Sequence, residues 1–406
     1  MSPGDPEQPL TYPMYGRTAL AAPEAWERLR QRCPVARVTL PSGDEATLLT
    51  RYDDVRQVLA DPRFGRLPTA DGAARIAENE SGGVFGGEMA TAVPQRGERH
   101  QRWRRTVGRW FTARRMNALR PGIEAMAGRL VEEMREHGHP ADLRAHLAFP
   151  LPVRVICKLL GVPDADRDRF AHWSDTLLNL TRYTQEEIDT AQADFTAYMS
   201  AHIAAERRRP GDDLLGELIT AEDTDGHRMS ERELVATGQG LLVAGHETTA
   251  NMIGKMVAML LADRRRWERL LAEPALARSA VEEALRFDAN PGIGIPRYLD
   301  APAEVGGTVL PPGTTVVCSM AAANRDDSAF EAAGEMALDR SPNPHLAFGA
   351  GPHACLGQGL ARIELTVVLD MLLRRLPTLE LAVPAADLRP LEGLAVGGLS
   401  EVPVRW

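Results

Sequence analysis

Cysteine is scarce in this chain: 406 residues contain four, Cys33, Cys157, Cys318 and Cys355, and none lies at a paired spacing. Such a set argues against a disulfide framework and is typical of a reducing compartment. Long apolar runs are also missing, and the first residues have no basic stretch followed by an apolar one, so we expect neither a membrane anchor nor a secretory signal. We therefore expect a cytoplasmic protein.

Positive charge is in deficit, with 47 Lys and Arg against 56 Asp and Glu and a net charge of -9, which argues against nucleic acid as a partner. Residues 96–115 reverse this balance, because they hold eight arginines and one histidine against the single acid Glu98. The segment is either a docking surface for an acidic partner or a solvated helix face. Trp103, Trp110 and Phe111 lie at the spacing of a helix core, which disfavours nucleic-acid binding here.

Local patterns predict a mainly α fold with small β-sheets. Residues 34–52 read as a hairpin that turns at Ser42 and Gly43, and residues 54–64 as a helix that stops at Asp61 before a proline. Residues 65–97 are rich in glycine and small side chains and lack periodicity, which predicts a functional loop over a binding pocket. On size alone the length favours two domains, although large single-domain enzymes also reach it.

No proline occurs between Gly211 and Glu273, so a long helix is possible there. Ser230 and Glu233 form a capping box that predicts its start. A helix over 231–261 would span on the order of 45 Å at ~1.5 Å per residue, enough to cross the molecule.

The middle of this helix is unusual, because Gly245 and the four polar residues after it stand where apolar side chains would be expected. Thr248 can donate to the carbonyl of Ala244 and so bend or open the helix. Glu247 beside it supplies an ionisable group suited to proton delivery. The alternative is a purely structural polar face with a threonine bend.

Cys355 lies in "FGAGPHACLGQGLARIEL", at the start of a predicted helix. The helix N-terminus and nearby backbone N–H groups are expected to keep its sulfur anionic. Gly349, Gly351 and Gly357 would let the backbone approach a flat ligand such as a haem face. Zinc would need more ligands at short spacing, and attached c-type haem would need C-x-x-C-H. A nucleophilic or merely packed thiol stays open on these residues alone.

The stretch F-G-x-G-x-H-x-C-x-G resembles the haem-binding signature of the cytochrome P450 family. "AGHETT" at 244–249 is similar to the oxygen-binding helix of that family, "EEALR" contains its E-x-x-R pair Glu283 and Arg286, and "HQRWR" is similar to its haem-contacting helix. The resemblance implies a P450-like fold, with a long central helix over the haem, and one domain over 1–406. It gives Glu283 and Arg286 a role in supporting the fold.

The resemblance also implies a site with haem b as cofactor. Cys355 would bind the iron as a thiolate, with Phe348 shielding the sulfur, and Glu247 and Thr248 would be catalytic. The residues it places around the cofactor are His100, Arg104, Arg297, Phe348, Gly349, His353, Cys355 and Gly357; four of them, His100, Arg104, Arg297 and His353, would meet the two propionates.

The implied function is a monooxygenase that hydroxylates or epoxidises a small organic molecule, as in natural-product tailoring. Electrons would come indirectly from NAD(P)H through a ferredoxin reductase and a ferredoxin. Two alternatives remain: oxidative aryl (C–C or C–N) coupling by the same haem, and a non-catalytic P450-like recruitment module. Asp327 stands where the family usually has proline, and small Gly292 and Gly294 suggest room for a bulky substrate.

Overall fold

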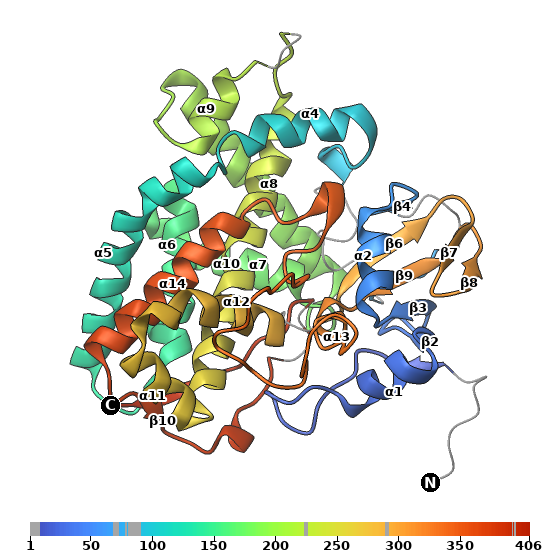
Figure 1. Ribbon diagram of the computed structural model, residues 1–406. Coiled ribbons are helices and arrows are strands. Elements are labelled where there is room, and N and C mark those ends of the chain that lie inside the picture. The colour runs from blue at the N-terminus through green and yellow to red at the C-terminus, as the bar shows by residue number, and fades with distance from the viewer. Residues whose placement is uncertain are drawn as a thin grey trace.

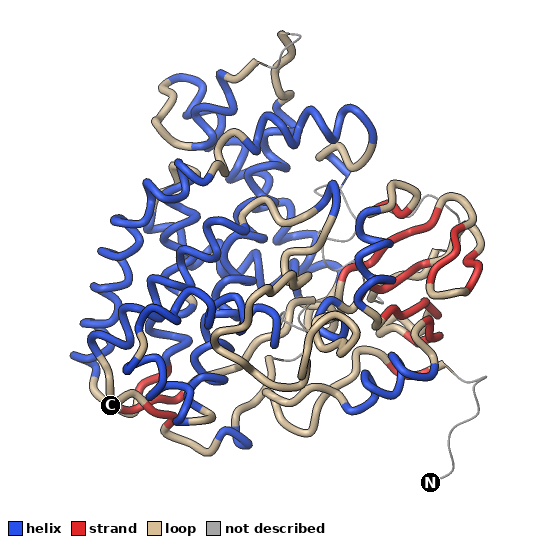
Figure 2. The backbone as a smooth tube through the Cα atoms, viewed as in Figure 1, coloured by secondary structure: helices blue, strands red, loops and turns tan. Residues whose placement is uncertain are grey.

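The fold is mainly helical with small sheets, as the sequence predicts. The computed structural model describes residues 9–67, 73–77, 79, 91–222, 226–288, 292–391, 393 and 395–406. Figures 1 and 2 show a large helical part on one side, with α10 crossing it, and a smaller part rich in strands on the other. Within the described residues no helix is both long enough and apolar enough to cross a bilayer.

The helices follow in chain order. They are α1 (Glu24–Arg32), α2 (Tyr52–Ala60), α4 (Gly97–Gly108), α5 (Ala113–His137), α6 (Pro150–Leu159), α7 (Arg167–Leu178), α8 (Gln185–Arg208), α9 (Leu214–Thr220), α10 (Glu231–Leu261), α11 (Arg264–Ala272), α12 (Ala277–Phe287), α13 (Met320–Ala323) and α14 (Gln358–Arg375). Shorter turns are the π-helical η1 (Arg144–Ala148) and the 3₁₀ turns η2 (Asp164–Asp166), η3 (Pro274–Leu276), η4 (Gly351–His353) and η5 (Ala385–Asp387).

The largest sheet has six strands in the order β1-β2-β3-β9-β6-β4, so it joins the N-terminal hairpin to strands from the last third of the chain. A three-stranded sheet (β10-β11-β5) and the pair β7-β8 complete the described strands. Their bounds are β1 (Leu10–Thr11), β2 (Val35–Thr39), β3 (Glu45–Leu49), β4 (Phe64–Gly65), β5 (Ala141–Asp142), β6 (Ile295–Leu299), β7 (Ala303–Val305), β8 (Thr308–Leu310), β9 (Thr315–Cys318), β10 (Glu380–Leu381) and β11 (Pro403–Arg405).

The predicted hairpin and the helix after it are confirmed. β2 and β3 pair antiparallel around a turn in which Gly43 has a positive φ of 82°. The helix ends with Ala60, where the Asp61 N–H still bonds back to the carbonyl of Gln57. Of the predicted lid over 65–97, residues 68–72, 78 and 80–90 lie outside the described residues.

The long helix α10 has the predicted bounds. The Ser230 side chain accepts from the Glu233 backbone N–H, and the Glu233 side chain accepts from the Ser230 N–H, so the capping box is formed. From Leu234 to Leu261 most of its side chains are buried. The helix is continuous through its polar middle, so the predicted opening of a turn is not observed, although Thr248 does donate to the carbonyl of Ala244.

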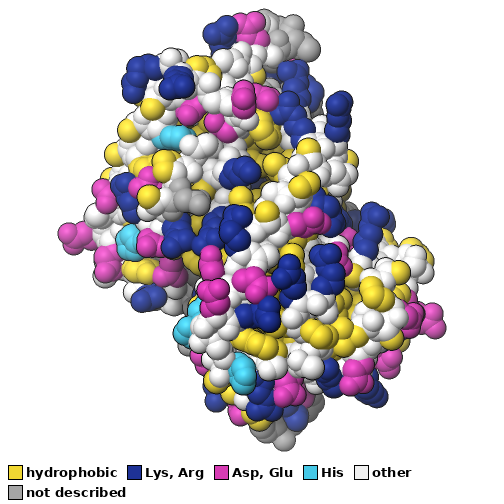
Figure 3. All heavy atoms as spheres, turned by 90° about the vertical axis from the view of Figure 1, so that its left-hand side faces the viewer, with side chains coloured by type: hydrophobic (Ala, Val, Ile, Leu, Met, Phe, Trp, Pro, Cys, Tyr) yellow, Lys and Arg dark blue, Asp and Glu magenta, His cyan; other side chains and the backbone are white. Residues whose placement is uncertain are grey.

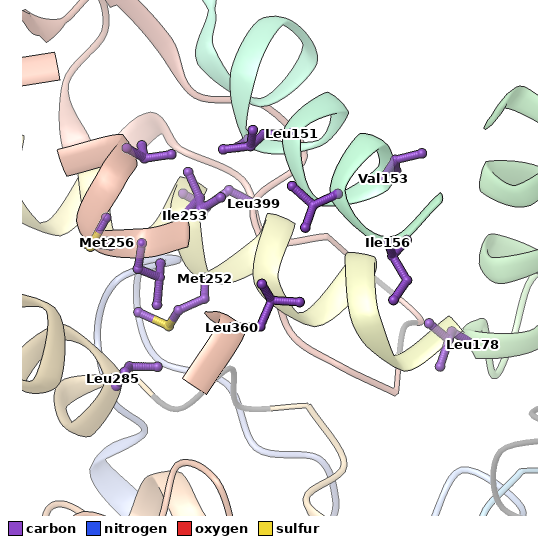
Figure 4. Packing of buried hydrophobic residues seen from close by; sticks show 14 of the residues in the cluster. Leu151, Val153, Ile156, Leu178, Met252, Ile253, Met256, Leu285, Leu360 and Leu399 are labelled. Atoms are coloured by element: carbon purple, nitrogen blue, oxygen red, sulfur yellow. The ribbon is translucent and has the colours of Figure 1, made fainter. Parts of the chain in front are cut away.

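Helix packing explains the glycine at position 245. A Cβ at this position would lie 2.9 Å from Cδ1 of Ile156 on α6, so the missing side chain lets the two helices approach closely. Figure 4 shows Leu151 and Ile156 of α6 beside α10, with Ile253 and Met252 of α10 nearby. The sequence reading, which attributed Gly245 to a helix bend, missed this contact.

Candidate functional site

Cys355 lies in a tight loop between η4 and α14. Its backbone N–H donates to the carbonyl of Phe348 at 2.8 Å, which folds the segment back on itself. Gly349 and Gly351 have φ values of 68° and 70°, which residues with a side chain rarely adopt. The loop ends at Gly357, the residue before α14.

The three glycines of the cysteine loop, Gly349, Gly351 and Gly357, differ in what a side chain would meet. A Cβ on Gly357 would meet no described atom within 4 Å, and one on Gly349 would only touch Ala354 at 4.0 Å. A Cβ on Gly351 would instead lie 2.6 Å from Cα of Ala60, so Gly351 is required by packing against α2. The expectation that all three clear space for a flat ligand is therefore wrong for Gly351 and consistent with the other two.

The sulfur of Cys355 is exposed, although protein lies close around it. The residue is exposed, yet burial raises the pKa of its thiol, which means that protein surrounds the group without covering it. The backbone groups of Gly357 and Gln358 and the guanidinium of Arg104 act in the opposite direction and lower this pKa. The backbone groups at the helix start thus favour the anionic sulfur, as expected, but burial acts against them and has the larger effect on this pKa.

Five nitrogen-bearing side chains gather near this loop from four elements. We call them the cationic cluster: Arg66 directly after β4, His100 and Arg104 on α4, Arg297 on β6 and His353 on η4. The rings of His100 and His353 lie 4.3 Å apart, and Arg104 donates to the carbonyl of Ala354, next to the cysteine. All four residues predicted to meet the propionates are therefore brought together.

Electrostatics within the cationic cluster are unfavourable. Burial, followed by the charges of the other members, lowers the pKa of His353 to about 3 and that of Arg66 to about 10. Among the described residues no carboxylate contributes to the pKa of any member. Nε of Arg297 is buried and has no hydrogen-bond partner among the residues that the structure describes. A dianion bound here would relieve this repulsion, and a ligand with two adjacent carboxylates fits the requirement.

Sequence reasoning missed Arg66. The residue is exposed, although burial by the surrounding protein lowers the pKa of its guanidinium. It belongs to no motif, and only the pairing of β4 with β6 brings it near Arg297. No local signal could have identified it.

α10 carries an accessible strip in its otherwise buried middle. Ala244 is exposed, and Gly240, Leu241, Gly245 and Thr248 are half-buried, while the residues on either side are buried. These positions repeat at the spacing of one helix face. The two predicted catalytic residues separate here, because Thr248 lies on the strip and Glu247 is buried with 4% of its surface exposed.

The Glu283 and Arg286 pair is fully buried, as expected for a fold-supporting role. Nε and Nη2 of Arg286 donate to the two oxygens of Glu283 at 2.7 and 2.8 Å. Arg286 also donates to the carbonyls of Asn324 and Ala333, and Arg340 donates to Glu283. The network connects α12 to the segment that precedes the cysteine loop.

Two further sequence readings concern this region. Asp327, which replaces the usual proline, accepts a hydrogen bond from the backbone N–H of Ala333 at 3.0 Å and so stabilises its turn.

The space for substrate that the sequence suggested at Gly292 and Gly294 is filled by backbone. A Cβ on Gly292 would lie 2.2 Å from the carbonyl oxygen of Ala395, and one on Gly294 would lie 2.6 Å from that of Cys318. These glycines permit backbone packing and leave no room for substrate.

The chain is similar to known proteins over nearly its whole length. The cytochrome P450 family model matches residues 170–384. The mycinamicin IV hydroxylase/epoxidase of Micromonospora griseorubida is 42% identical over 400 residues, covering 98% of this chain and 99% of that protein. The nocardicin C N-oxygenase of Nocardia uniformis subsp. tsuyamanensis is 40% identical over 397 residues, which cover 98% of each.

Solved structures agree with the sequence relatives. The LnmA cytochrome P450 hydroxylase from the leinamycin biosynthetic pathway of Streptomyces atroolivaceus S-140 has a TM-score of 0.88 and 40% identity, covering 98% of this chain and 100% of that one. These three relatives are named as oxygenases or hydroxylases, and none supports aryl coupling or a recruitment role. The chain therefore belongs to the cytochrome P450 family, as a haem-dependent monooxygenase that takes electrons from redox partners and acts on a small molecule.

Proposed function

We propose that this protein hydroxylates or epoxidises a small organic molecule in a tailoring step of natural-product biosynthesis. Relatives named for mycinamicin IV, nocardicin C and leinamycin support the substrate class. The observation that carries the reaction class is the accessible Cys355 thiol beside a cationic cluster in which no described carboxylate takes part.

In this proposal the cysteine loop would hold the haem. Cys355 would bind the iron, Gly349 and Gly357 would leave space for the macrocycle, and the cationic cluster would hold the propionates. Phe348 packs beside the loop under the guanidinium of Arg362, which lies 4.4 Å from its ring centre, and so helps to exclude water from the sulfur. When bound, the haem supplies reductive activation of dioxygen.

Two residues of α10, Thr248 and Glu247, would deliver protons. Thr248 presents its hydroxyl oxygen on the accessible strip of α10, where it can order a water molecule. Glu247 is the adjacent ionisable group that would replenish the proton. Substrate would lie against the same strip, because its small residues leave the helix backbone accessible.

Electrons would arrive from a ferredoxin, itself reduced by NAD(P)H through a ferredoxin reductase. α4 suits the docking of an acidic carrier, because His100 and Arg104 face inward while Arg105 and Arg109 are exposed. The helix also lies close to the cysteine loop: Leu356 is 3.9 Å from the Cβ position of Gly108. Figure 3 shows the face that lies on the left in Figure 1, where groups of basic side chains occur among acidic ones although the protein is acidic as a whole.

A carbon monoxide difference spectrum tests the cofactor assignment. The reduced protein should show the red-shifted Soret band of thiolate ligation, and Cys355→Ser should abolish it. Cys33→Ser is the matched control, since that thiol is also exposed. A red-shifted band that persists in Cys355→Ser would overturn the ligand assignment. The substrate class is then tested by incubation with mycinamicin IV and nocardicin C, the compounds named for the relatives, with product mass increased by one oxygen as the expected result.

A further inference from the structure

The cationic cluster contains one arginine more than two haem propionates need. Its three guanidinium groups belong to Arg66, Arg104 and Arg297, and its two imidazoles belong to His100 and His353. Burial lowers the pKa of both imidazoles, so the histidines are neutral at neutral pH, and protonation of either one would only add positive charge. The guanidinium groups stay charged, including that of Arg66 with its pKa of about 10.

The carboxylates available to the cluster do not balance these charges. The two propionates would neutralise two of the three guanidinium groups, and among the described residues no carboxylate contributes to the pKa of any cluster member. The charge of the Cys355 thiolate would be balanced by the iron that it binds. One positive charge therefore remains, and a charge surrounded by protein needs a counter-ion.

Arg66 is the arginine of the cluster that lacks a partner. Nη1 of Arg297 donates to the carbonyl of Pro296 at 2.9 Å. Arg104 donates to the carbonyl of Ala354. Arg66 forms no hydrogen bond or ion pair with the described part of the chain. It is also exposed, whereas Arg104 is half-buried and Arg297 is buried, so a ligand can reach Arg66 more readily than the other two.

Strand pairing places Arg66 beside Arg297. β4 and β6 pair antiparallel, with Gly65 opposite Tyr298, and the two strands lie side by side in Figure 1. Continued by one position, this register sets Arg66 opposite Arg297. Side chains at opposite positions are neighbours, and like charges there are destabilising. An anion bound by Arg66 would therefore relieve repulsion between the two guanidinium groups.

The backbone next to Arg66 is held from a second direction. Arg96, directly before α4, forms an ion pair with Asp300, directly after β6. The same guanidinium packs over Gly65, where a Cβ would overlap it. Arg66 therefore extends from a fixed backbone, which lowers the entropy cost of binding a ligand.

We infer that Arg66 binds a carboxylate of the substrate. A guanidinium group presents its donors in a planar fork that matches a carboxylate in a bidentate pair. A monoanion balances the remaining positive charge, whereas a phosphate group with nearly two negative charges would exceed it. The substrate is therefore a small organic acid. This inference rests on the proposed function, because it requires a substrate that binds next to the haem.

Matched probes test Arg66 without knowledge of the natural substrate. They are alkanoic acids of increasing chain length with a terminal imidazole, each paired with its own methyl ester. In the haem-loaded enzyme the imidazole nitrogen of either probe binds the iron and shifts the Soret band. Spectral titration gives the Kd of each acid and of its ester, and their ratio isolates the contribution of the carboxylate.

We expect a chain length at which the wild type binds the acid about tenfold more tightly than the ester, because hydrogen bonds between charged groups are strong. Arg66→Gln should remove this preference, and Arg66→Lys should keep part of it. Arg63→Gln is the matched control and should keep all of it. Arg63 is exposed directly before β4 and already pairs with Asp61 at 2.6 Å.

Equal affinity for acid and ester at every chain length in the wild type would overturn the inference. So would a preference that survives in Arg66→Gln. If Arg66→Gln does not retain haem, Arg66→Lys decides, since its preference should fall below that of the wild type. Failure of the proposed function gives a different result: without haem no probe shifts a Soret band, and this inference fails as well.

Discussion

The hydroxyl of Thr248 donates a hydrogen bond of 2.9 Å to the carbonyl of Ala244, one turn earlier in α10. Its single proton is therefore directed into the helix, so the hydroxyl oxygen can act only as an acceptor toward the accessible strip. Any proton that passes Thr248 must then be supplied by another group.

Thr248→Ala should leave haem content and substrate binding close to wild type while diverting reducing equivalents to hydrogen peroxide, because the acceptor that orders water is lost. Thr248→Ser keeps the hydroxyl and should retain most of the coupling. Peroxide and product are quantified against NADPH consumed. Coupling in Thr248→Ala equal to that of the wild type would remove Thr248 from the relay.

Charge reversal at Arg105 or Arg109 should slow reduction by an acidic ferredoxin, since Arg105 is exposed on α4 and Arg109 is exposed directly after it. The effect should be greatest at low ionic strength and should fade as salt screens the charges. Stopped-flow reduction at several salt concentrations measures it. Arg115 is a less informative site, because it already pairs with Glu217 at 2.9 Å.

Arg405→Glu serves as the control for that experiment, because Arg405 lies on β11, at the opposite end of the molecule from α4. Turnover driven by added peroxide should be unchanged in all three variants. If neither Arg105 nor Arg109 affects the reduction rate at low salt, the arginine-rich segment is a solvated helix face.

The haem-free protein should lose stability as the pH falls, because of His353. The pKa of His353 is about 3 in the folded protein against an ordinary 6.5, lowered first by burial and then by its cationic neighbours. Between pH 6.5 and about 3 the unfolded chain therefore binds a proton at His353 that the folded chain does not bind. The free energy of unfolding decreases as the pH is lowered through this range.

Urea unfolding at a series of pH values checks this expectation. His353→Gln should flatten the dependence, and His172→Gln, at an exposed position on α7, should not. The haem-bound protein should show a smaller loss over the same range, since carboxylates beside His353 favour its charged form. An equal slope in His353→Gln and wild type would contradict the assignment of the dependence to this group.

Glu283→Gln should destabilise the protein by about 3–5 kcal/mol, because it leaves the buried guanidinium of Arg286 without its counter-charge. Glu282→Gln is the neighbouring control: Glu282 pairs with Arg362 at 2.7 Å but is partly exposed, so the cost should be smaller. Urea denaturation measures both. Equal costs would mean that burial of the Glu283 network is not what stabilises this region.

Features that the sequence predicted well are local. The capping box at Ser230 and Glu233, the turn at Gly43 and the cysteine loop each depend on residues a few positions apart. The family resemblance added the residues that converge on the loop from elsewhere, such as His100 and Arg297. The extent of helix α10 was predicted from both the local capping box and the family resemblance.

Features that the sequence could not supply are non-local. Arg66 joins the cationic cluster through strand pairing, and Arg144 meets Glu247 across 103 positions of the chain. Gly292 looked like space for substrate and proved to be a site of backbone packing against Ala395. In each case the deciding neighbour comes from a distant segment, so no pattern along the chain could reveal it.

The close fit of Gly351 against Ala60 has a consequence for how the protein is made. The contact joins the first and last parts of the chain, so the cysteine loop cannot take its final shape until a ribosome has synthesised nearly all of the protein. Contacts between such distant positions also slow folding, because a long loop must close before they form. The cysteine loop therefore reaches its final conformation only when α2 docks against it.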